Sequence, residues 1–194
     1  MTYSDRHGFC DWSNSQEIYS QYHDYEWGKP EYESKKLFEI LALETFQAGL
    51  SWIIVLKKRE NFRKAFDNFN PKLISEYSDN KISELIKNGL IIRNKKKILS
   101  TINNAKIYNN HFSDLYSFSS YLWNYVNYKP VVNFRKKLSD IPKSTNLSKK
   151  ISKDMKELGF SYCGPVTIYS FMQASGMVND HLVTCPNFLK CQSD

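Results

Sequence analysis

The sequence predicts an all-α fold, and three observations support this prediction. Along most of the chain, apolar residues recur at the spacing of three and four residues that is typical of helices. Ser, Asp, Pro and Gly stand where such stretches begin or end. No stretch alternates between polar and apolar residues with the period of two that indicates a half-buried strand. We therefore expect roughly eight or nine helices.

The first long helix is expected to begin at Ser34 and to stop at Gly49. Ser34 is suited to the N-cap, the apolar residues that follow keep a helical period, and glycine commonly ends a helix. Glu44 falls on or beside the apolar face of this helix, which is an unusual place for a carboxylate. A second helix begins at Ser51 in the run SWIIVLKKRENFRKAF, with one apolar side and an exposed basic side.

Shorter helices are expected along the rest of the chain. They lie in PKLISEYSD, in DNKISELIKNG, in LIIRNKKKILSTINNAKIYNN, in DLYSFSSYLWNYV (114–126), in SKKISKDMKELGF (148–160) and in PVTIYSFMQASG (165–176). Residues 127–147 carry two prolines and mixed polar residues, so we interpret them as a connection between two helical lobes. The tail PNFLKCQSD is expected to be frayed. Residues 1–194 as a whole are expected to form one domain.

The chain carries a net charge of +7, from 27 lysines and arginines against 20 aspartates and glutamates. This balance suits a polyanionic partner, but the excess is dispersed and many proteins are basic for other reasons. The first residues, MTYSDRHGFC, are too polar for a secretion signal, and no apolar run approaches the ~18 residues of a membrane helix. We therefore expect a cytoplasmic protein with no membrane partner.

Residues 80–108 are expected to form two helices joined by a tight turn in the run IKNGLIIRNKKK. Gly89 would let the chain turn closely, and such a turn can present backbone N–H groups to a phosphate. The second helix would begin with cations, which the helix dipole disfavours and a phosphate backbone would favour. These cations are Arg93, Lys95, Lys96 and Lys97. The alternative is an ordinary turn beside a solvated basic helix end.

Each end of the chain offers one thiolate and one imidazole. The two pairs are Cys10 with His23 and His181 with Cys185. Together they would make the Cys₂His₂ set that suits tetrahedral zinc, and four protein ligands would leave no open position for a reacting water. The alternative is buried cysteines and hydrogen-bonded histidines. Cys191 and His7 are rival ligands, whereas His111 and Cys163 are expected to pack or to lie on the surface.

Four runs of this sequence resemble one known family. They are DWSNSQEIYSQYHDYEWG, QAGLSWIIVLKKRENFRKAF, GLIIRNKKKI and GFSYCGPVTIYSFMQASGMVNDH. The sequence resembles the 3-methyladenine DNA glycosylase I family, the constitutive bacterial type, over nearly the whole chain from Cys10 to Cys185. The runs YHDYEWG and QAGLSW are specific to that family. The resemblance implies a helix-hairpin-helix fold, a structural zinc ion, and removal of 3-methyladenine as the free base from double-stranded alkylated DNA.

The resemblance also implies roles for particular residues. The zinc ligands would be Cys10, His23, His181 and Cys185, so that one ion joins the N- and C-terminal segments. The substrate pocket would consist of Trp12, Tyr19, Tyr22, Trp27, Glu44 and Trp52. The DNA contacts would be Gln47, Gly49, Leu50, Gly89, Arg93 and Lys95, with Leu50 filling the gap left by an extruded base. Pro165 and Val166 stand where some relatives carry hydroxyl residues, so no DNA contact is assigned to them.

Glu44 is the expected catalytic residue, and its first role would be recognition. As a carboxylate it would accept hydrogen bonds from the exocyclic amine of adenine, reject the carbonyl oxygen of guanine and favour a positively charged base. Trp52, Tyr22 and Trp12 would stack on that base. Stabilising the developing sugar cation is a secondary role. The alternatives are a packed aromatic core and a glutamate that faces solvent.

No lysine is placed as a Schiff-base nucleophile, so we expect hydrolysis of the glycosidic bond without strand cleavage. We also expect the enzyme to be a monomer. Asp180 is a candidate for activating water, but a helix-end role or a contact that orients His181 is the expected one. Two other classes of function remain open. One is a non-catalytic protein that marks lesions with the same hairpin, and the other is a zinc hydrolase.

Overall fold

The computed structural model describes residues 8–192, which are mostly helical, as predicted. The α-helices in this range are α1 (Glu17–Tyr25), α2 (Ser34–Gln47), α3 (Trp52–Ala65), α4 (Pro71–Ser75), α5 (Asp79–Lys87), α6 (Lys95–His111), α7 (Phe118–Trp123), α8 (Asn146–Glu157), α9 (Pro165–Ala174) and α10 (Asn187–Lys190). Single 3₁₀ turns lie at Asp11–Asn14, Asp67–Phe69, Asn124–Val126 and Leu138–Asp140. A helix suited to spanning a membrane was found nowhere between residues 8 and 192.

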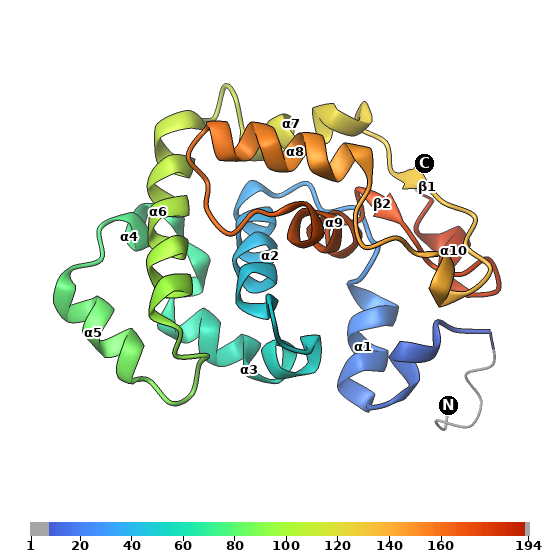
Figure 1. Ribbon diagram of the computed structural model, residues 1–194, viewed down its shortest axis with the longest axis horizontal. Coiled ribbons are helices and arrows are strands. Elements are labelled where there is room, and N and C mark those ends of the chain that lie inside the picture. Colours follow the sequence, from blue (N-terminus) through green and yellow to red (C-terminus); the bar gives the residue numbers. More distant parts are fainter. Residues whose placement is uncertain (1–7, 193–194) are drawn as a thin grey trace.

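Helix α2 runs through the middle of the molecule (Figure 1), with α3, α6, α7 and α9 packed against it. Its residues are buried on nearly every side between Leu37 and Phe46, which is the pattern of a core helix. This burial carries two carboxyl groups into the interior. Glu39 pairs there with Arg63 at 2.7 Å. Glu44 is 4% exposed, and its Oε2 has no hydrogen-bond partner in the described part of the chain.

The two ends of α2 differ from the prediction in one respect. Glu33 is the N-cap, and Ser34 is the first helical residue. The Ser34 hydroxyl accepts a hydrogen bond from the backbone N–H of Ser119 at 3.0 Å, so it joins α2 to α7 instead of capping α2. At the other end the helix stops at Gln47, and Gly49 adopts φ +82°, which glycine tolerates without a Cβ clash.

Two short strands were not predicted. β1 (Val131–Val132) and β2 (Val178–Asn179) pair in parallel, with Val131 opposite Val178. Two residues are too few to display a period of two, so the sequence pattern could not indicate them. Figure 1 shows this pair with α1 and α10 at one end of the molecule, while α4, α5 and α6 lie at the other.

Helices α5 and α6 form the predicted helical hairpin, and the turn between them differs in detail. Arg93 lies in the turn and not in α6, which begins at Lys95 after the N-cap Asn94. Gly89 does not adopt a left-handed φ, and a Cβ there would meet nothing within 4 Å. The turn therefore does not need glycine for its own geometry. Asn88 closes it instead, because its Oδ1 accepts a hydrogen bond from the N–H of Leu90 at 2.9 Å.

The C-terminal tail is not frayed up to residue 192, which corrects the prediction. Asn187, Phe188 and Cys191 in and after α10 are 1%, 6% and 0% exposed. The Asn187 amide donates to the backbone carbonyl of His23 at 3.2 Å. Short polar tails usually fray, but this one buries an anchor residue against α1.

Candidate active site and metal cluster

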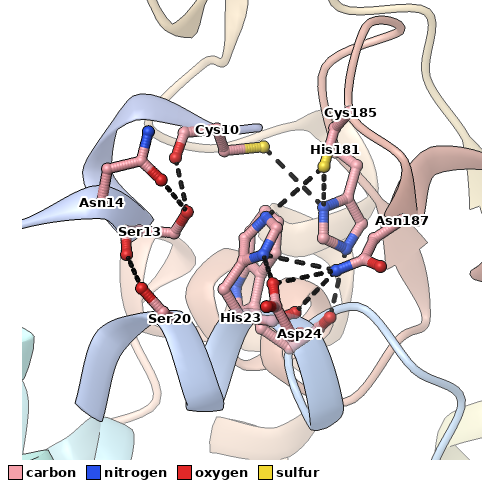
Figure 2. A network of polar contacts seen from close by, with 10 residues as sticks. Cys10, Ser13, Asn14, Ser20, His23, Asp24, His181, Cys185 and Asn187 are labelled. Carbon is pink, nitrogen blue, oxygen red and sulfur yellow. Dashed lines mark hydrogen bonds and ion pairs between the residues drawn. The ribbon is translucent and has the colours of Figure 1, made fainter. Parts of the chain in front are cut away.

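Four buried side chains from the two ends of the chain converge on one point. They are Cys10, which precedes the first 3₁₀ turn, His23 in α1, and His181 and Cys185 after β2. Their ligand atoms all lie within 4.8 Å of one another, and Figure 2 shows both sulfurs and both imidazoles directed to one region. The spacing in the sequence offered two separate pairs, and the fold brings the pairs together.

The separations within the cluster fit a tetrahedral zinc ion. The sulfur of Cys185 lies 3.6 Å from Nε2 of His23 and 3.6 Å from Nδ1 of His181. The sulfur of Cys10 lies 3.8 Å from the same Nδ1. A tetrahedron with Zn–S near 2.3 Å and Zn–N near 2.0 Å has ligand atoms roughly 3.3–3.8 Å apart. The donor set and these three separations therefore suit this metal.

Each imidazole is oriented by a partner on its other nitrogen. Nδ1 of His23 lies 2.7 Å from Oδ1 of Asp24, and Asn187 donates to that oxygen at 3.5 Å. Nε2 of His181 lies 3.2 Å from the carbonyl oxygen of Trp27. Because these partners accept hydrogen bonds, each ring keeps its other nitrogen free for a metal, as is usual around zinc.

The thiols of Cys10 and Cys185 interact strongly. The hydrogen bond from Cys10 lowers the pKa of Cys185, and the same contact raises the pKa of Cys10. This pairing favours the thiolate at Cys185, the form in which cysteine binds metals.

The rival ligands do not join this cluster within the described residues. Cys191 is buried but is not one of the four converging groups. Cys163 packs in the main core, and His111 is exposed at the end of α6, as expected for residues of packing and surface. His7 lies outside the described residues.

A cavity of about 470 Å³ adjoins the metal cluster. Its wall consists of Trp12, Tyr19, Tyr22, Trp27, Glu44, Gln47, Trp52, Leu138, Ile141, Ser170 and Gln173. All six residues that the resemblance assigned to the substrate pocket are in this wall, and Gln47, assigned to DNA, joins them. The rings therefore line a space instead of only filling a core.

The rings of the pocket are fixed by contacts on their outer sides. Trp12 and Trp27 meet edge to face with centroids 5.1 Å apart, and Trp27 meets His181 in the same way at 4.7 Å. The hydroxyl of Tyr19 accepts a hydrogen bond from the N–H of Ile53 at 2.9 Å, at the start of α3. The pocket wall is thus held by the metal cluster on one side and by α3 on the other.

Among residues 8–192, Glu44 is the only carboxyl group in the wall of this pocket. Burial raises its pKa to about 8, because the charged form loses its hydration. Oε2 of Glu44 and Nε1 of Trp52 are buried without a hydrogen-bond partner, so the pocket carries an unused acceptor and an unused donor. The pKa of Tyr22 is raised by burial and by the nearby Glu44. Glu44 does not face solvent.

Four lining residues were not foreseen. Leu138 and Ile141 come from the segment that was interpreted only as a connection, and Ser170 and Gln173 come from α9. The spacing of three between Ser170 and Gln173 places them on one face of a mainly apolar helix, which is a detectable signal. No sequence pattern indicates Leu138 or Ile141, because they lie in and after a single 3₁₀ turn.

Asp180 does not orient His181, which corrects that expectation. Its fully buried carboxylate accepts hydrogen bonds from Asn133 Nδ2, Arg135 Nε, the Tyr169 hydroxyl and Gln173 Nε2. The ring of His181 is oriented by Trp27 instead. Because each oxygen of Asp180 accepts two hydrogen bonds, the group has little capacity left to activate a water.

The residues assigned to DNA contact lie in two loops. The wedge loop, residues 47–50, begins at the last residue of α2 and ends at Leu50, which is 40% exposed. The hairpin loop, residues 88–94, joins α5 to α6 and contains Gly89 and Arg93, with Lys95 exposed just beyond it. Lys97 is not exposed. It is 5% exposed and contacts the backbone of the wedge loop, so the phosphate role expected for it is wrong.

Comparisons with known proteins agree with this geometry. The methyladenine glycosylase family model matches residues 12–188. A DNA-3-methyladenine glycosylase of Haemophilus influenzae is 46% identical over 177 residues, which cover 91% of this chain and 96% of that protein. A crystal structure of 3-methyladenine DNA glycosylase I has a TM-score of 0.89 at 43% identity, covering 92% of this chain and 98% of that chain.

A second solved structure is a tyrosine-to-phenylalanine variant of 3-methyladenine DNA glycosylase I in complex with 3-methyladenine. It has a TM-score of 0.88 at 36% identity, and it covers 95% of this chain and 97% of that chain. The family model spans helices α1 to α9 and every residue of the pocket wall. The chain belongs to the methyladenine glycosylase family.

Proposed function

We propose that this chain is a DNA glycosylase that excises 3-methyladenine from alkylated double-stranded DNA by hydrolysing the N-glycosidic bond. One observation carries the proposal: Glu44 has an unpaired buried oxygen in a cavity walled by tryptophan and tyrosine rings. An apolar core gains nothing from such a group, because a buried unpaired polar atom costs about 1–3 kcal/mol. A ligand that is cationic and donates hydrogen bonds satisfies it.

The target base must leave the helical stack to reach this cavity. Extrusion costs a few kcal/mol and is easier for a damaged base, which is one source of selectivity. The exposed Leu50 at the tip of the wedge loop suits the role of the apolar side chain that fills the gap in the duplex. The cavity of about 470 Å³ lies within the usual range for small-molecule sites.

Recognition couples the charge of the base to the ionisation of Glu44. In the free protein the raised pKa, about 8, keeps most of this carboxyl protonated at pH 7. A cationic base lowers that pKa, and the carboxylate that forms accepts hydrogen bonds from the exocyclic amine. Adenine lacks the charge, and guanine presents a carbonyl oxygen at the same edge. Stacked rings add about 0.5–2 kcal/mol for a cation over an aromatic face.

Hydrolysis of this glycosidic bond requires little from the protein beyond selecting and positioning the damaged base. An adenine methylated at N3 departs as a neutral base, so its glycosidic bond is already weakened. No lysine lines the pocket in the described part of the chain, so no Schiff base forms and the strand stays intact. Because Asp180 is already fully hydrogen-bonded, we assign Glu44 the stabilisation of the developing sugar cation as well.

We further propose that Cys10, His23, His181 and Cys185 hold one structural zinc ion per chain. The ion would supply cross-linking and not chemistry, because four protein ligands fill its tetrahedral shell. Helices α5 and α6 with the hairpin loop would act as a helix-hairpin-helix element that grips a backbone phosphate. We also propose that the active unit is a monomer, since residues of a single chain are enough to form the pocket wall.

The test is release of base from alkylated duplex DNA under single-turnover conditions. The wild-type chain should release 3-methyladenine and leave the strand uncleaved on a denaturing gel. Glu44→Gln keeps the shape and removes the charge, so its excision rate should fall about 10- to 100-fold while the duplex is still bound. Binding of alkylated duplex without any base release would instead indicate a protein that only marks lesions.

Removal of the metal distinguishes the proposed glycosylase from the remaining alternative, a zinc hydrolase. In a zinc hydrolase, removal of the ion would stop the reaction in a protein that stays folded. A structural ion predicts that the fold and the activity are lost together.

A further inference from the structure

The wedge loop and the hairpin loop face each other across a second cavity, of about 550 Å³. Its wall consists of Ala48, Gly49, Leu50, Ile92, Arg93, Asn94 and Lys97. The loops come from separate helices, α2 and α5–α6, so some contact must set their relative position.

Lys97 makes that contact. It lies in the first turn of α6, where Oδ1 of the N-cap Asn94 accepts a hydrogen bond from its backbone N–H at 3.2 Å. Its ammonium reaches across to α2 and donates to the carbonyl of Phe46 at 2.8 Å and to that of Ala48 at 2.6 Å. Desolvation lowers the pKa of Lys97, so keeping a buried cation here has a cost that packing alone would not require.

The acceptors explain why a cation is suited to this position. The last carbonyls of a helix lack partners within the helix and carry partial negative charge. At the end of α2 the carbonyl of Thr45 is satisfied by the N–H of Ala48. That of Gln47 accepts from the N–H of Leu50 at 2.6 Å. Lys97 satisfies the carbonyls of Phe46 and Ala48, which fixes the backbone on both sides of Gln47.

A second lysine ties the hairpin loop from the opposite direction. Lys58 in α3 donates to the carbonyl of Gly89 at 3.3 Å and to that of Leu90 at 3.0 Å. Helix α3 begins directly after the wedge loop. Each loop is thus held by an ammonium from an element that adjoins the other loop.

We propose that Lys97 is a positioning residue that links the grip of the hairpin loop on the DNA backbone to the presentation of Leu50 for insertion into the duplex. This inference rests on the proposed function. When a phosphate docks at the start of α6, the same helical turn holds the end of α2, and Leu50 is set at a fixed distance from that phosphate. Lys97 touches neither the base nor the reacting bond.

Lys97→Met tests the inference, since methionine keeps an unbranched side chain and removes the ammonium. Loss of the ammonium should displace Leu50, and this should lower the single-turnover rate of excision from alkylated duplex about 10- to 100-fold. Affinity for a duplex with an abasic site should fall as well. Affinity for free 3-methyladenine, followed by tryptophan fluorescence, should stay within about twofold of wild type because the base pocket is intact. Lys106→Met removes an exposed lysine from the same helix and is the control for net charge.

The outcomes separate the inference from the proposed function. A wild-type chain that releases no base refutes the function, whereas excision by Lys97→Met at the wild-type rate refutes only the inference. If Lys97→Met loses affinity for free 3-methyladenine in parallel with excision, the inference is also refuted, because that pattern indicates that the base pocket itself is disrupted. If Lys97→Met does not fold, Lys97→Arg keeps the charge and changes the geometry. Adding Leu50→Ala to that variant should then weaken abasic-site binding less than it does in wild type, and equal effects would refute the link.

Discussion

The imidazole of His181 donates a hydrogen bond from Nε2 to the backbone carbonyl of Trp27 at 3.2 Å. The other nitrogen of His181 faces the sulfurs of Cys10 and Cys185, while the indole of Trp27 lines the pocket. His181 therefore contacts both the Cys/His cluster and Trp27, a residue of the pocket wall. Because the two sites share this contact, a substitution in one site should alter the structure of the other.

Removing the metal is expected to unfold the pocket and not merely to loosen it. A chelator strong enough to extract zinc should abolish free 3-methyladenine binding and the cooperative thermal transition together, and added zinc should restore both. Elemental analysis of the purified protein should give about one zinc per chain. A metal-free protein that keeps its transition and its base affinity would contradict the structural role.

Gly28→Ala is expected to damage the metal cluster from outside its ligand set. Gly28 has φ +79°, and a Cβ there would lie 2.8 Å from Nε2 of His181, where the hydrogen bond to Trp27 is made. Backbone strain and a clash should together cost about 3 kcal/mol or more of unfolding free energy and should weaken zinc retention against a chelator.

Gly49→Ala is the matched control for this substitution. Gly49 has a similar φ of +82°, but a Cβ there would meet nothing within 4 Å. Its cost should therefore be the backbone strain alone, about 1–2 kcal/mol, with zinc retention unchanged. Equal losses of unfolding free energy in Gly28→Ala and Gly49→Ala, measured by chemical denaturation, would show that the contact with His181 does not contribute to the destabilisation.

The stability of the free protein is expected to fall as the pH rises from about 4.5 to about 8, because of Glu44. An unperturbed glutamate has a pKa of 4.5, and burial raises the pKa of Glu44 to about 8, so between these values the unfolded chain has released a proton that the folded chain still holds. The Glu44 contribution to the unfolding free energy then decreases by about 1.4 kcal/mol for each pH unit, and the loss is complete above the folded pKa.

Glu44→Gln isolates this effect. The variant should match wild-type stability near about pH 4.5 and exceed it increasingly toward about pH 8, in urea denaturation at each pH. Glu17→Gln, which changes an exposed residue of α1, should show no such divergence. A constant difference between wild type and Glu44→Gln across this range would mean that Glu44 is already ionised in the free protein.

Leu50→Ala is expected to lower the affinity for duplex DNA and to leave the affinity for the free base unchanged. Leu50 is 40% exposed at the tip of the wedge loop, so its truncation removes little from the core. Affinity for a duplex with an abasic site should fall about tenfold, which corresponds to about 1.4 kcal/mol. Affinity for free 3-methyladenine should not change. Leu115→Ala removes a fully exposed leucine between α6 and α7 and should leave both affinities as they are.

The helices were predictable because their apolar faces are long enough to display a period. The burial of α2, with Glu44 among its apolar residues, follows from that pattern. The pocket residues could be named through resemblance, since ring-lined sites and ordinary aromatic cores have the same composition. The pairing of His23 with Cys185, 162 residues apart, could not come from spacing at all.

The features that escaped prediction involve backbone atoms or irregular chain. Lys97 was interpreted as a phosphate contact because it belongs to a basic run, yet its partners are backbone carbonyls, which every residue possesses. Leu138 reaches the pocket from a single turn that no periodicity marks. The docking of α10 involves the amides of Asn187 and Asn179, which donate to backbone carbonyls. Such contacts depend on the folded arrangement and leave no local pattern.

The order in which the four residues of the Cys/His cluster are synthesised also has a consequence. The first two ligands leave the ribosome early, and the sulfur that completes the set follows 162 residues after His23. During most of translation the nascent chain therefore carries half of a binding site, and the pocket ring of Trp27 has no His181 beside it. A nascent chain therefore cannot assemble this Cys/His cluster, or place His181 beside Trp27, before residues 181–185 have emerged from the ribosome.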